Sequence, residues 1–424
     1  MRSATSRRFT VERCSISSFS LSCPSGVRMT SFTASSNPLN TQTRCPSGTV
    51  AGDIVAVSSN GERSSRGYDS LSMCADLNTA WTIGSVEIPT RLVLAPMAGV
   101  SVQAFRRQGR RYGAGLVCSE MVSCAGLSHR NERTLGYLRI GADEHPLAVQ
   151  IFGSEPALMA EAARMVEAAG ADLVDINFGC PVRKVTKTGA GASLLDEPHR
   201  AAAIVEAVAE AVDVPVCVKM RRGLENGSRT ALEVGPQLVE AGAASLTLHP
   251  RSAQQMYTGT ADHALTAELV ELVDVPVVAS GDITSRGRAA SVLEETGCAA
   301  VMVGRVAQGN PWAVGEIAGI VNGTPTREEV VAELLHFMRD TVAEMGEQRA
   351  TGFLKKFYGW YLGRGRFPKP FANELVRLET IEQVEERLLA AAPGANDVLA
   401  RLEADLPAAE NVVLDLPVSI YAGG

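Results

Sequence analysis

The sequence predicts an α/β protein whose main domain is a (β/α)8 TIM barrel, followed by a small C-terminal helical domain. Eight short apolar runs recur between residues 92 and 303, and stretches with helical spacing separate them. The length of the region that these runs span is close to the roughly 250 residues that a barrel of this kind occupies. A doubly wound sheet suits about five or six strands, and no G-x-G-x-x-G follows a strand, so a dinucleotide-binding fold lacks its fingerprint.

The predicted strands are nearly continuous apolar, β-branched runs, as parallel strands buried on both faces are. Between them lie Ala- and Glu-rich stretches, and residues 155–170, for example, place their apolar side chains on one helical face. Gly170, Gly242 and Gly297 each stand shortly before a strand, where a glycine typically ends a helix. The strands are expected at 92–96, 115–120, 147–152, 172–177, 215–220, 245–249, 276–280 and 299–303.

Four regions are expected along the chain. They are a disordered low-complexity N-terminal extension (1–80), the barrel (85–322), the helical domain (325–392, with helices over 327–345 and 379–391) and a loosely ordered tail (393–424). The first 50 residues hold twelve Ser, seven Thr and six Arg but one acid, which is too little apolar surface to fold. This composition is typical of a transit peptide, although a real start at Met29 or Met73 is the interpretation we favour.

Composition excludes several classes of protein. No apolar run reaches the roughly 18 residues of a membrane span. The nine cysteines form no C-x2-C pair and the six histidines no H-x3–5-H pair, so we expect no metal site. An odd number of irregularly spaced cysteines fits a reducing compartment, so a cytoplasmic location is predicted, and a monomer is expected.

Candidate site residues stand where the predicted strands end, because those ends gather at the active face of a barrel. Nearly every strand is followed by a polar or glycine-containing group. The candidates are Pro96, Met97, Ala98, Gln150, Asn177, Cys180, Lys219, His249, Arg251, Ser280, Gly281, Asp282, Gly304 and Arg305.

The last two strands carry a candidate phosphate site. Gly281 and the Gly304-Arg305 pair follow them, at the position where barrels often hold phosphate on backbone N–H groups. Alternatively, these glycines only form tight turns. Gln150 has an amide donor and acceptor suited to the edge of a heterocycle.

Three further residues have reactive or ionisable side chains. Lys219 could neutralise an anionic ring or form a Schiff base, unless it pairs with Glu120 or Asp175. His249 could donate to a cofactor carbonyl or be structural. Cys180 lies in a Gly-Cys-Pro turn, where its thiol could act as nucleophile or general acid rather than as a small buried hydrophobe.

The stretch 349–377 interleaves basic and aromatic side chains. It holds seven basic residues, Lys355, Lys356 and Arg364 among them, against one acid, together with seven of the 21 aromatic residues. This pattern suits a nucleic-acid backbone and splayed bases, although a helix with a cationic face and an aromatic core looks the same. Two more basic clusters stand at Arg106, Arg107, Arg110 and Arg111, and at Arg183, Lys184 and Lys187.

The strand-end motifs together resemble the tRNA-dihydrouridine synthases, in particular the bacterial B-type branch. The resemblance runs in order from about residue 85 to about residue 390. Two departures are Ser280, where the family commonly has Asn, and Pro250 between His249 and Arg251, which removes one backbone donor. The motifs are LAPMAGVS (94–101), SEM (119–121), QIFG (150–153), DINFGCP (175–181), KVTKTGAGASLL (184–195), VKMR (218–221), LHPR (248–251), SGDI (280–283), VGR (303–305) and GNPW (309–312).

The resemblance implies an FMN barrel that uses NADPH to reduce uridines in tRNA. Reduced FMN would give hydride to C6 of a flipped-out uridine, Cys180 would give the proton to C5, and Asn177 would lie near the base. Arg251, Lys355, Lys356 and Arg364 would bind the substrate. The implied FMN ligands are Pro96, Met97, Ala98, Gln150, Lys219, His249, Ser280, Gly281, Asp282, Gly304 and Arg305.

Other classes of function remain open from the residues alone. One is an FMN-dependent TIM-barrel oxidoreductase that acts on a free dihydropyrimidine or a dihydroorotate-like small molecule. Others are an aldolase-like barrel with Lys219 as Schiff base and a non-catalytic RNA-binding protein. The basic, aromatic stretch 349–377 favours the tRNA enzyme over the first, because a small substrate does not require it.

Overall fold

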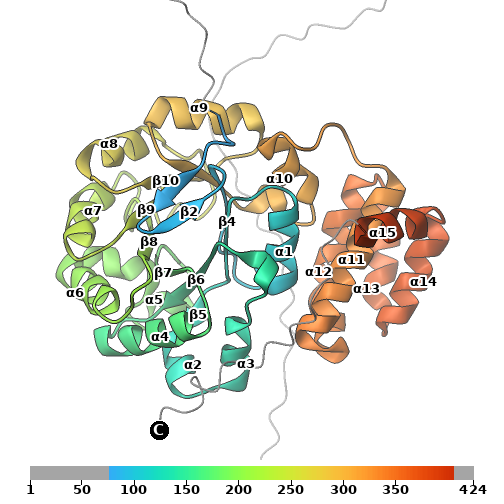
Figure 1. Ribbon diagram of the computed structural model, residues 1–424, viewed down its shortest axis with the longest axis horizontal. Coiled ribbons are helices and arrows are strands. Elements are labelled where there is room, and N and C mark those ends of the chain that lie inside the picture. The colour runs from blue at the N-terminus through green and yellow to red at the C-terminus, as the bar shows by residue number, and fades with distance from the viewer. Residues whose placement is uncertain (1–75, 405–424) are drawn as a thin grey trace, which may run out of the picture. The chain divides into compact units, whose positions relative to one another are not determined.

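The computed structural model describes residues 76–404, in which eight parallel strands close into a barrel (Figure 1). Pairing of β3 with β11 and of β4 with β6 completes the ring. The predicted TIM barrel is therefore confirmed. The barrel strands are β3 (Leu92–Leu94), β4 (Leu116–Cys118), β6 (Leu147–Phe152), β7 (Leu173–Phe178), β8 (Val216–Arg221), β9 (Ser245–His249), β10 (Val277–Ser280) and β11 (Ala300–Val303).

Helices follow the strands and pack their apolar faces on the outside of the barrel. Gly297 ends α9 with a left-handed φ of 65°, which a glycine adopts without strain, so its predicted capping role is confirmed. The outer helices are α1 (Gln103–Arg111), α4 (Pro156–Ala168), α6 (Pro198–Ala209), α7 (Thr230–Glu240), α8 (Ala264–Leu272), α9 (Arg286–Thr296) and α10 (Pro311–Ala318).

A small antiparallel hairpin, absent from the sequence prediction, closes the amino-terminal end of the barrel. It consists of β1 (Trp81–Ile83) and β2 (Val86–Ile88). Ile83 and Ile88 are buried in a cluster with side chains from inside the barrel, among them Val93 and Leu116. The opposite end of the barrel is the one that opens to the candidate site.

Several short elements lie within the strand-to-helix connections. They are β5 (Val122–Ser123), α2 (Cys124–Ser128), α3 (Glu132–Leu135), α5 (Arg183–Thr186) and the 3-10 turns Gly136–Leu138, Ala142–Glu144, Gly191–Asp196 and Arg305–Ala307. The segment that contains α5 directly follows Cys180, so its basic side chains lie beside the candidate site.

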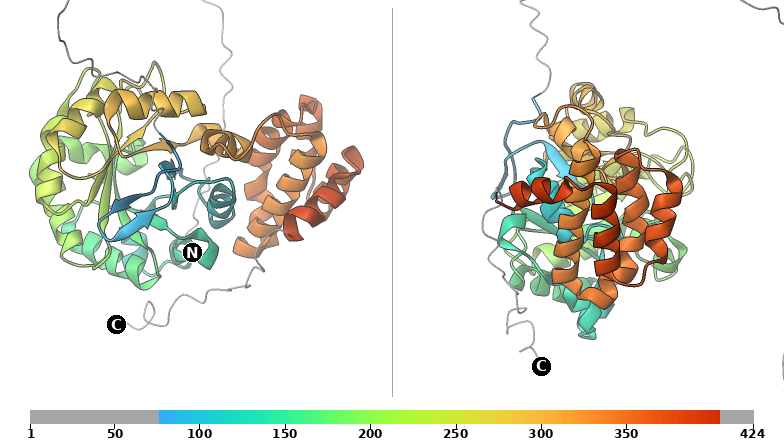
Figure 2. Two further views of the ribbon diagram at one scale, coloured as in Figure 1. Left: turned by 45° about the horizontal axis from the view of Figure 1, so that its top comes forward. Right: turned by 90° about the vertical axis from the view of Figure 1, so that its right-hand side faces the viewer.

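The last five described helices form a bundle that packs on α1 (Figure 2). Aromatic side chains build its core, and the Phe337 and Phe357 ring centroids are 4.8 Å apart. The expected helices over 327–345 and 379–391 correspond to α11 and α14. The helices are α11 (Arg327–Met345), α12 (Glu347–Arg364), α13 (Lys369–Arg377), α14 (Ile381–Ala391) and α15 (Ala395–Ala404).

The expectation of a loosely ordered tail from residue 393 is wrong for residues 395–404. These residues form α15, whose Leu399 is buried in the common core. Arg339 of α11 also pairs with Glu403 at 2.7 Å. The packing comes from an apolar stripe with helical spacing, formed by Ala395, Val398, Leu399 and Leu402. Residues 405–424 and the predicted extension, apart from residues 76–80, lie outside the described residues.

None of the helices within residues 76–404 is both long and apolar enough to cross a membrane. The same part of the chain contains no group of three or more His, Cys, Asp or Glu side chains arranged to hold a metal ion.

Candidate active site

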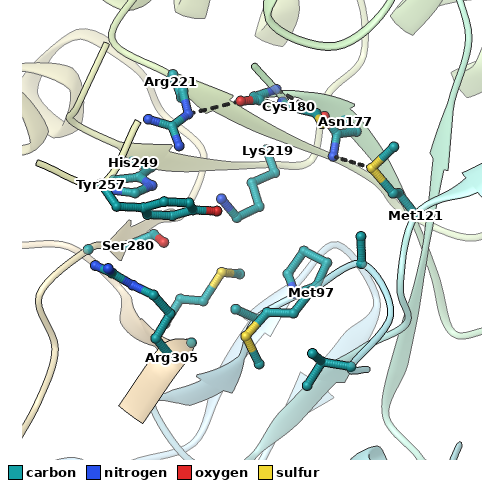
Figure 3. Close-up of a pocket in the computed structure, with 18 of the residues that line it drawn as sticks. Met97, Met121, Asn177, Cys180, Lys219, Arg221, His249, Tyr257, Ser280 and Arg305 are labelled. Carbon is teal, nitrogen blue, oxygen red and sulfur yellow. Dashed lines mark hydrogen bonds between the residues drawn. The ribbon is translucent and has the colours of Figure 1, made fainter. Parts of the chain in front are cut away.

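A cavity of about 620 Å³ opens at the carboxyl ends of the barrel strands (Figure 3). All the candidate residues from the strand ends line it, with the exception of Arg251. The lining includes Pro96, Met97, Ala98, Gln150, Asn177, Cys180, Lys219, His249, Ser280, Gly281, Asp282, Gly304 and Arg305. Six of the barrel strands thus bring residues from their carboxyl-terminal parts to one place, and β3 and β4 contribute from the segments that follow them.

A chain of buried amide and carboxylate groups supports the floor of the cavity. Gln150 Nε2 donates to Asp175 Oδ2 at 2.6 Å, and Asn177 Nδ2 donates to Gln150 Oε1 at 2.7 Å. Asn177 Oδ1 in turn accepts the backbone N–H of Cys180 at 2.8 Å. The first two links join buried groups and the last is part-buried, so each amide is oriented by its neighbour.

Lys219 extends into the cavity from β8, next to this chain (Figure 3). Within residues 76–404 its ammonium donates no hydrogen bond that satisfies ordinary geometry. Burial and then the charge of Arg221 lower the pKa of Lys219, whereas burial raises the pKa of the Asp175 carboxyl. Lys219 forms no ion pair with Glu120 or Asp175 within 4.0 Å, although the charge of Asp175 acts to raise the pKa of Lys219 against the effect of burial.

Cys180 lies in the turn that follows β7, with its thiol half-buried at the cavity wall. Asn177 shapes this turn, since its Oδ1 accepts the N–H groups of both Gly179 and Cys180. From the adjacent strand β8, Arg221 Nε donates a hydrogen bond of 2.9 Å to the Gly179 carbonyl. The thiol and the Lys219 ammonium therefore face the same cavity and interact electrostatically.

His249 is a neutral imidazole in this environment. Burial, followed by the charges of Lys219 and three arginines, lowers the pKa of His249 to about 2. Arg251 Nη1 lies 3.3 Å from His249 Nε2, and because a guanidinium can only donate, Nε2 is the acceptor. The remaining proton is therefore on Nδ1, which leaves His249 one N–H donor.

Arg251 is buried beneath the cavity instead of lining it. Its Nη2 lies 2.9 and 2.7 Å from the two carboxylate oxygens of Asp282 and also donates to the Gly259 carbonyl. Asp282 has a left-handed φ of 54°, which costs a non-glycine residue conformational energy. Burial would raise the pKa of Asp282, but bonds from the Ala261 N–H and Arg251 outweigh it and lower that pKa. Arg251 thus holds the carboxylate of a residue whose backbone is strained.

The opposite side of the cavity is formed by the ends of β10 and β11. Gly281 has a φ of 116°, and a Cβ there would meet the His249 ring at 3.0 Å, so only glycine fits. Arg305 is half exposed and lies over the Tyr257 ring, 4.5 Å from its centroid. Backbone N–H groups and the Arg305 guanidinium are the groups at this end that are suited to bind an anion.

Several lining residues were not among the predicted site residues. Met302 stands near the end of β11, so the strand-end rule could have selected it, and Arg221 ends β8 in the VKMR motif but is given no role in the prediction. Tyr257 comes instead from the long connection after β9, and no local pattern marks it. Its ring is about half exposed and lies 5.5 Å from the Arg221 guanidinium.

The three predicted basic clusters differ in their surroundings. The α1 arginines are structural: Arg106 pairs with Glu144 at 2.5 Å, Arg107 with Asp143 at 2.6 Å and Arg111 with Glu333 at 2.5 Å. Arg110 donates to two backbone carbonyls. This cluster is therefore not a free basic surface. In contrast, Arg183, Lys184 and Lys187 of the segment beside Cys180 are exposed.

In the helical bundle the three predicted tRNA contacts also differ. Arg364 is exposed and Lys355 half-buried, and neither has a charged partner within residues 76–404. Lys356 donates a hydrogen bond to the Gly99 carbonyl of the barrel, so its ammonium already has a partner. None of the three lines the cavity.

Comparison with known proteins gives a family model, curated relatives and solved structures that this chain is similar to. Residues 93–395 match the family model described as dihydrouridine synthase (Dus). The tRNA-dihydrouridine synthase B of Pseudomonas aeruginosa is 39% identical over 303 residues, 70% of this chain and 91% of that protein. That of Vibrio cholerae is 36% identical over 306 residues, 71% of this chain and 95% of that protein. A structure of morphinone reductase in complex with tetrahydroNAD has 17% identity and a TM-score of 0.44, covering 59% of this chain and 93% of that one.

Proposed function

This chain belongs to the dihydrouridine synthase family, and from that premise we propose that it uses FMN and NADPH to reduce the C5–C6 double bond of uridines in tRNA. The observation that carries the proposal is the convergence of Cys180, Lys219 and Arg305 on one cavity. A thiol for proton transfer, a cation for a polar ring edge and a cation for a phosphate are brought together by three different strands.

The cavity suits FMN in size and in charge. Its volume of about 620 Å³ lies within the range of about 300–1,000 Å³ of cofactor pockets. Pro96, Met97 and Ala98 supply an apolar wall for the ring, and Gln150, Lys219 and the single N–H of His249 supply its polar partners. Ser280, Gly281, Gly304 and Arg305 form the phosphate end. Asp282 serves this end indirectly, because Arg251 neutralises it.

The reaction needs a hydride and a proton on neighbouring carbons. FMN, when bound and reduced by NADPH, would supply the hydride for uridine C6. Cys180 holds the proton for C5 on Sγ, and after transfer the nearby Lys219 ammonium stabilises the thiolate until solvent reprotonates it. Asn177 positions the Cys180 turn, and a direct contact between Asn177 and the base remains a prediction.

The surroundings of the cavity support a macromolecular substrate. Val182, Met256 and Tyr257 are exposed apolar side chains on the rim, suited to stack on a base that has left its helix. The exposed basic residues after Cys180, together with Lys355 and Arg364, can contact phosphates on either side of that base. We further propose a monomer as the active unit.

Replacing Cys180 by Ala tests the proposal. Purified wild-type protein should be yellow, and Cys180→Ala should lower tRNA uridine reduction by about 10²- to 10⁴-fold, the scale of a lost general acid. Flavin content and the rate at which NADPH reduces the flavin should stay unchanged in the same variant. Dihydrouridine in tRNA, mapped position by position, is the measurement.

Three outcomes would contradict the proposal. If the purified protein took up no FMN, the proposed cofactor would be wrong. Unchanged uridine reduction in Cys180→Ala would remove the thiol from its role. Faster reduction of a free pyrimidine than of tRNA would favour a small-molecule oxidoreductase.

A further inference from the structure

The turn after β3 is the part of the cavity wall that carries Pro96, Met97 and Ala98. Ser101 organises it: Ser101 Oγ accepts the Met97 N–H at 3.0 Å and donates to the Ala95 carbonyl at 2.9 Å. Gly99, at the tip, has a left-handed φ of 69°. The conformation of these few residues therefore sets one wall of the cavity.

Both sides of Gly99 are held by groups from outside the turn. Its N–H donates to Glu120 Oε2 at 2.8 Å, and its carbonyl accepts from the Lys356 ammonium. Glu120 follows β4 and is 8% exposed, whereas Lys356 belongs to α12 of the helical bundle. A carboxylate of the barrel and an ammonium of the bundle thus form hydrogen bonds to the same short segment from two sides.

Lys356 is an exposed residue, but its ammonium makes more than one contact in this place. It lies 3.9 Å from the centroid of the Phe353 ring and 5.3 Å from that of Phe357. Burial raises the pKa of Glu120, and the Gly99 N–H and the Lys356 charge act against this rise. Loss of the ammonium would therefore remove the hydrogen bond to the Gly99 carbonyl and weaken the one between the Gly99 N–H and Glu120.

We propose that Lys356 and Glu120 are positioning residues that hold the turn at 96–101 in the shape that receives the flavin ring. Lys356 then connects the helical bundle to the cofactor site, in place of the tRNA-phosphate contact that its sequence context predicts. The inference rests on the proposed function, because it takes FMN as the ligand of the cavity.

The experiment compares two neighbouring lysines in the full chain. Lys356→Met keeps the stem but removes the donor and should raise the FMN dissociation constant about tenfold, the scale of one charge-assisted hydrogen bond. It should also speed hydrogen exchange at the amides of residues 99–101 in the cofactor-free protein. Lys356→Arg keeps a donor and should restore both. Lys355→Met should weaken tRNA binding and leave FMN affinity and exchange unchanged.

The outcomes separate this inference from the proposed function. Wild-type protein that binds no FMN defeats the proposed function, and amide exchange still decides the role of Lys356. Unchanged FMN affinity and exchange in Lys356→Met, with weaker tRNA binding, overturns the inference. Should Lys356→Met fail to fold, Glu120→Ala removes the other bond to Gly99, and normal exchange at residues 99–101 in that variant overturns it equally.

Discussion

Asp175 shows how one buried carboxylate can control groups that it does not touch. It is 4% exposed and lies at the start of the hydrogen-bond chain that runs through Gln150 and Asn177 to the Cys180 backbone. Without Asp175, the Gln150 carboxamide could rotate and exchange its donor for its acceptor. Asn177 would then meet a donor in place of an acceptor. Asp175 is therefore a positioning residue for the thiol.

Asp175→Ala is expected to lower the kcat of uridine reduction by about tenfold or more, because each buried hydrogen bond lost costs about 1–3 kcal/mol. Asp175→Asn keeps an acceptor and should lose less. The tRNA dissociation constant should not change in either variant, since Asp175 is buried beneath the cavity and its hydrogen-bond partner is Gln150. Steady-state kinetics with separate kcat and KM values would measure this, and equal kcat in all three proteins would contradict it.

The same carboxyl predicts a pH effect on stability. Burial raises its pKa above the ordinary 3.8, so the folded protein holds this proton more tightly than the unfolded chain. The stability it contributes is complete below about pH 4 and is lost as the pH rises toward the raised value. Asp175→Asn cannot ionise, and its unfolding free energy relative to wild type should increase over that pH range. Chemical unfolding at several pH values checks the sign, and a constant difference would contradict it.

At the residue scale, the sequence predicts where along a strand a residue lies better than it predicts which groups its side chain contacts. Residues such as Gln150 and Lys219 are placed by strand ends, and strand ends are visible as limits of apolar runs. Arg251 follows a strand as well, yet its side chain turns under the cavity to Asp282. Which way a side chain turns depends on a carboxylate 31 residues further along the chain, and no local pattern reports this.

At the scale of elements, apolar periodicity predicts the barrel well because all eight strands are buried on both faces. The β1–β2 hairpin is missed because each of its strands has three residues, too few for a pattern. Charge density is the least reliable guide. The arginines of α1 and the basic residues of α12 look alike in sequence, but acidic residues from α11 and from the Ala142–Glu144 turn neutralise only the former.

This difference predicts how tRNA binding responds to mutation. Arg364→Gln and Lys355→Gln should each weaken binding and reduce the slope of log affinity against log salt by about one, the value for a lost phosphate contact. Arg107→Gln is the matched control, because Arg107 is already paired with Asp143 and Asp340 at 2.6 and 3.2 Å. Binding titrations at several salt concentrations provide the slopes. Equal slopes for Arg364→Gln and Arg107→Gln would argue against a role of α12 in binding tRNA.

At the scale of the whole described molecule, a buried polar cluster joins the barrel to the helical bundle. Glu333 of α11 is 2% exposed and accepts from Gln108 Nε2 at 2.6 Å and from Arg111 Nη2 at 2.5 Å. Tyr361 of α12 donates to Gln108 Oε1 at 2.7 Å. Because each polar group is satisfied by one on the other side, the two parts support each other's folding.

Breaking this cluster should therefore destabilise both parts together. Glu333→Ala leaves Arg111 as a largely buried charge without its partner, a change that typically costs about 3–5 kcal/mol, whereas Glu333→Gln keeps an acceptor and should cost less. Removing both charges in Glu333→Leu with Arg111→Met should recover much of the loss, because no unpaired charge remains. Tryptophan fluorescence during urea unfolding can follow this, since Trp312 lies in α10 beside the barrel and Trp360 in α12. If the double variant were no more stable than Glu333→Ala, packing at this junction would matter more than its charges.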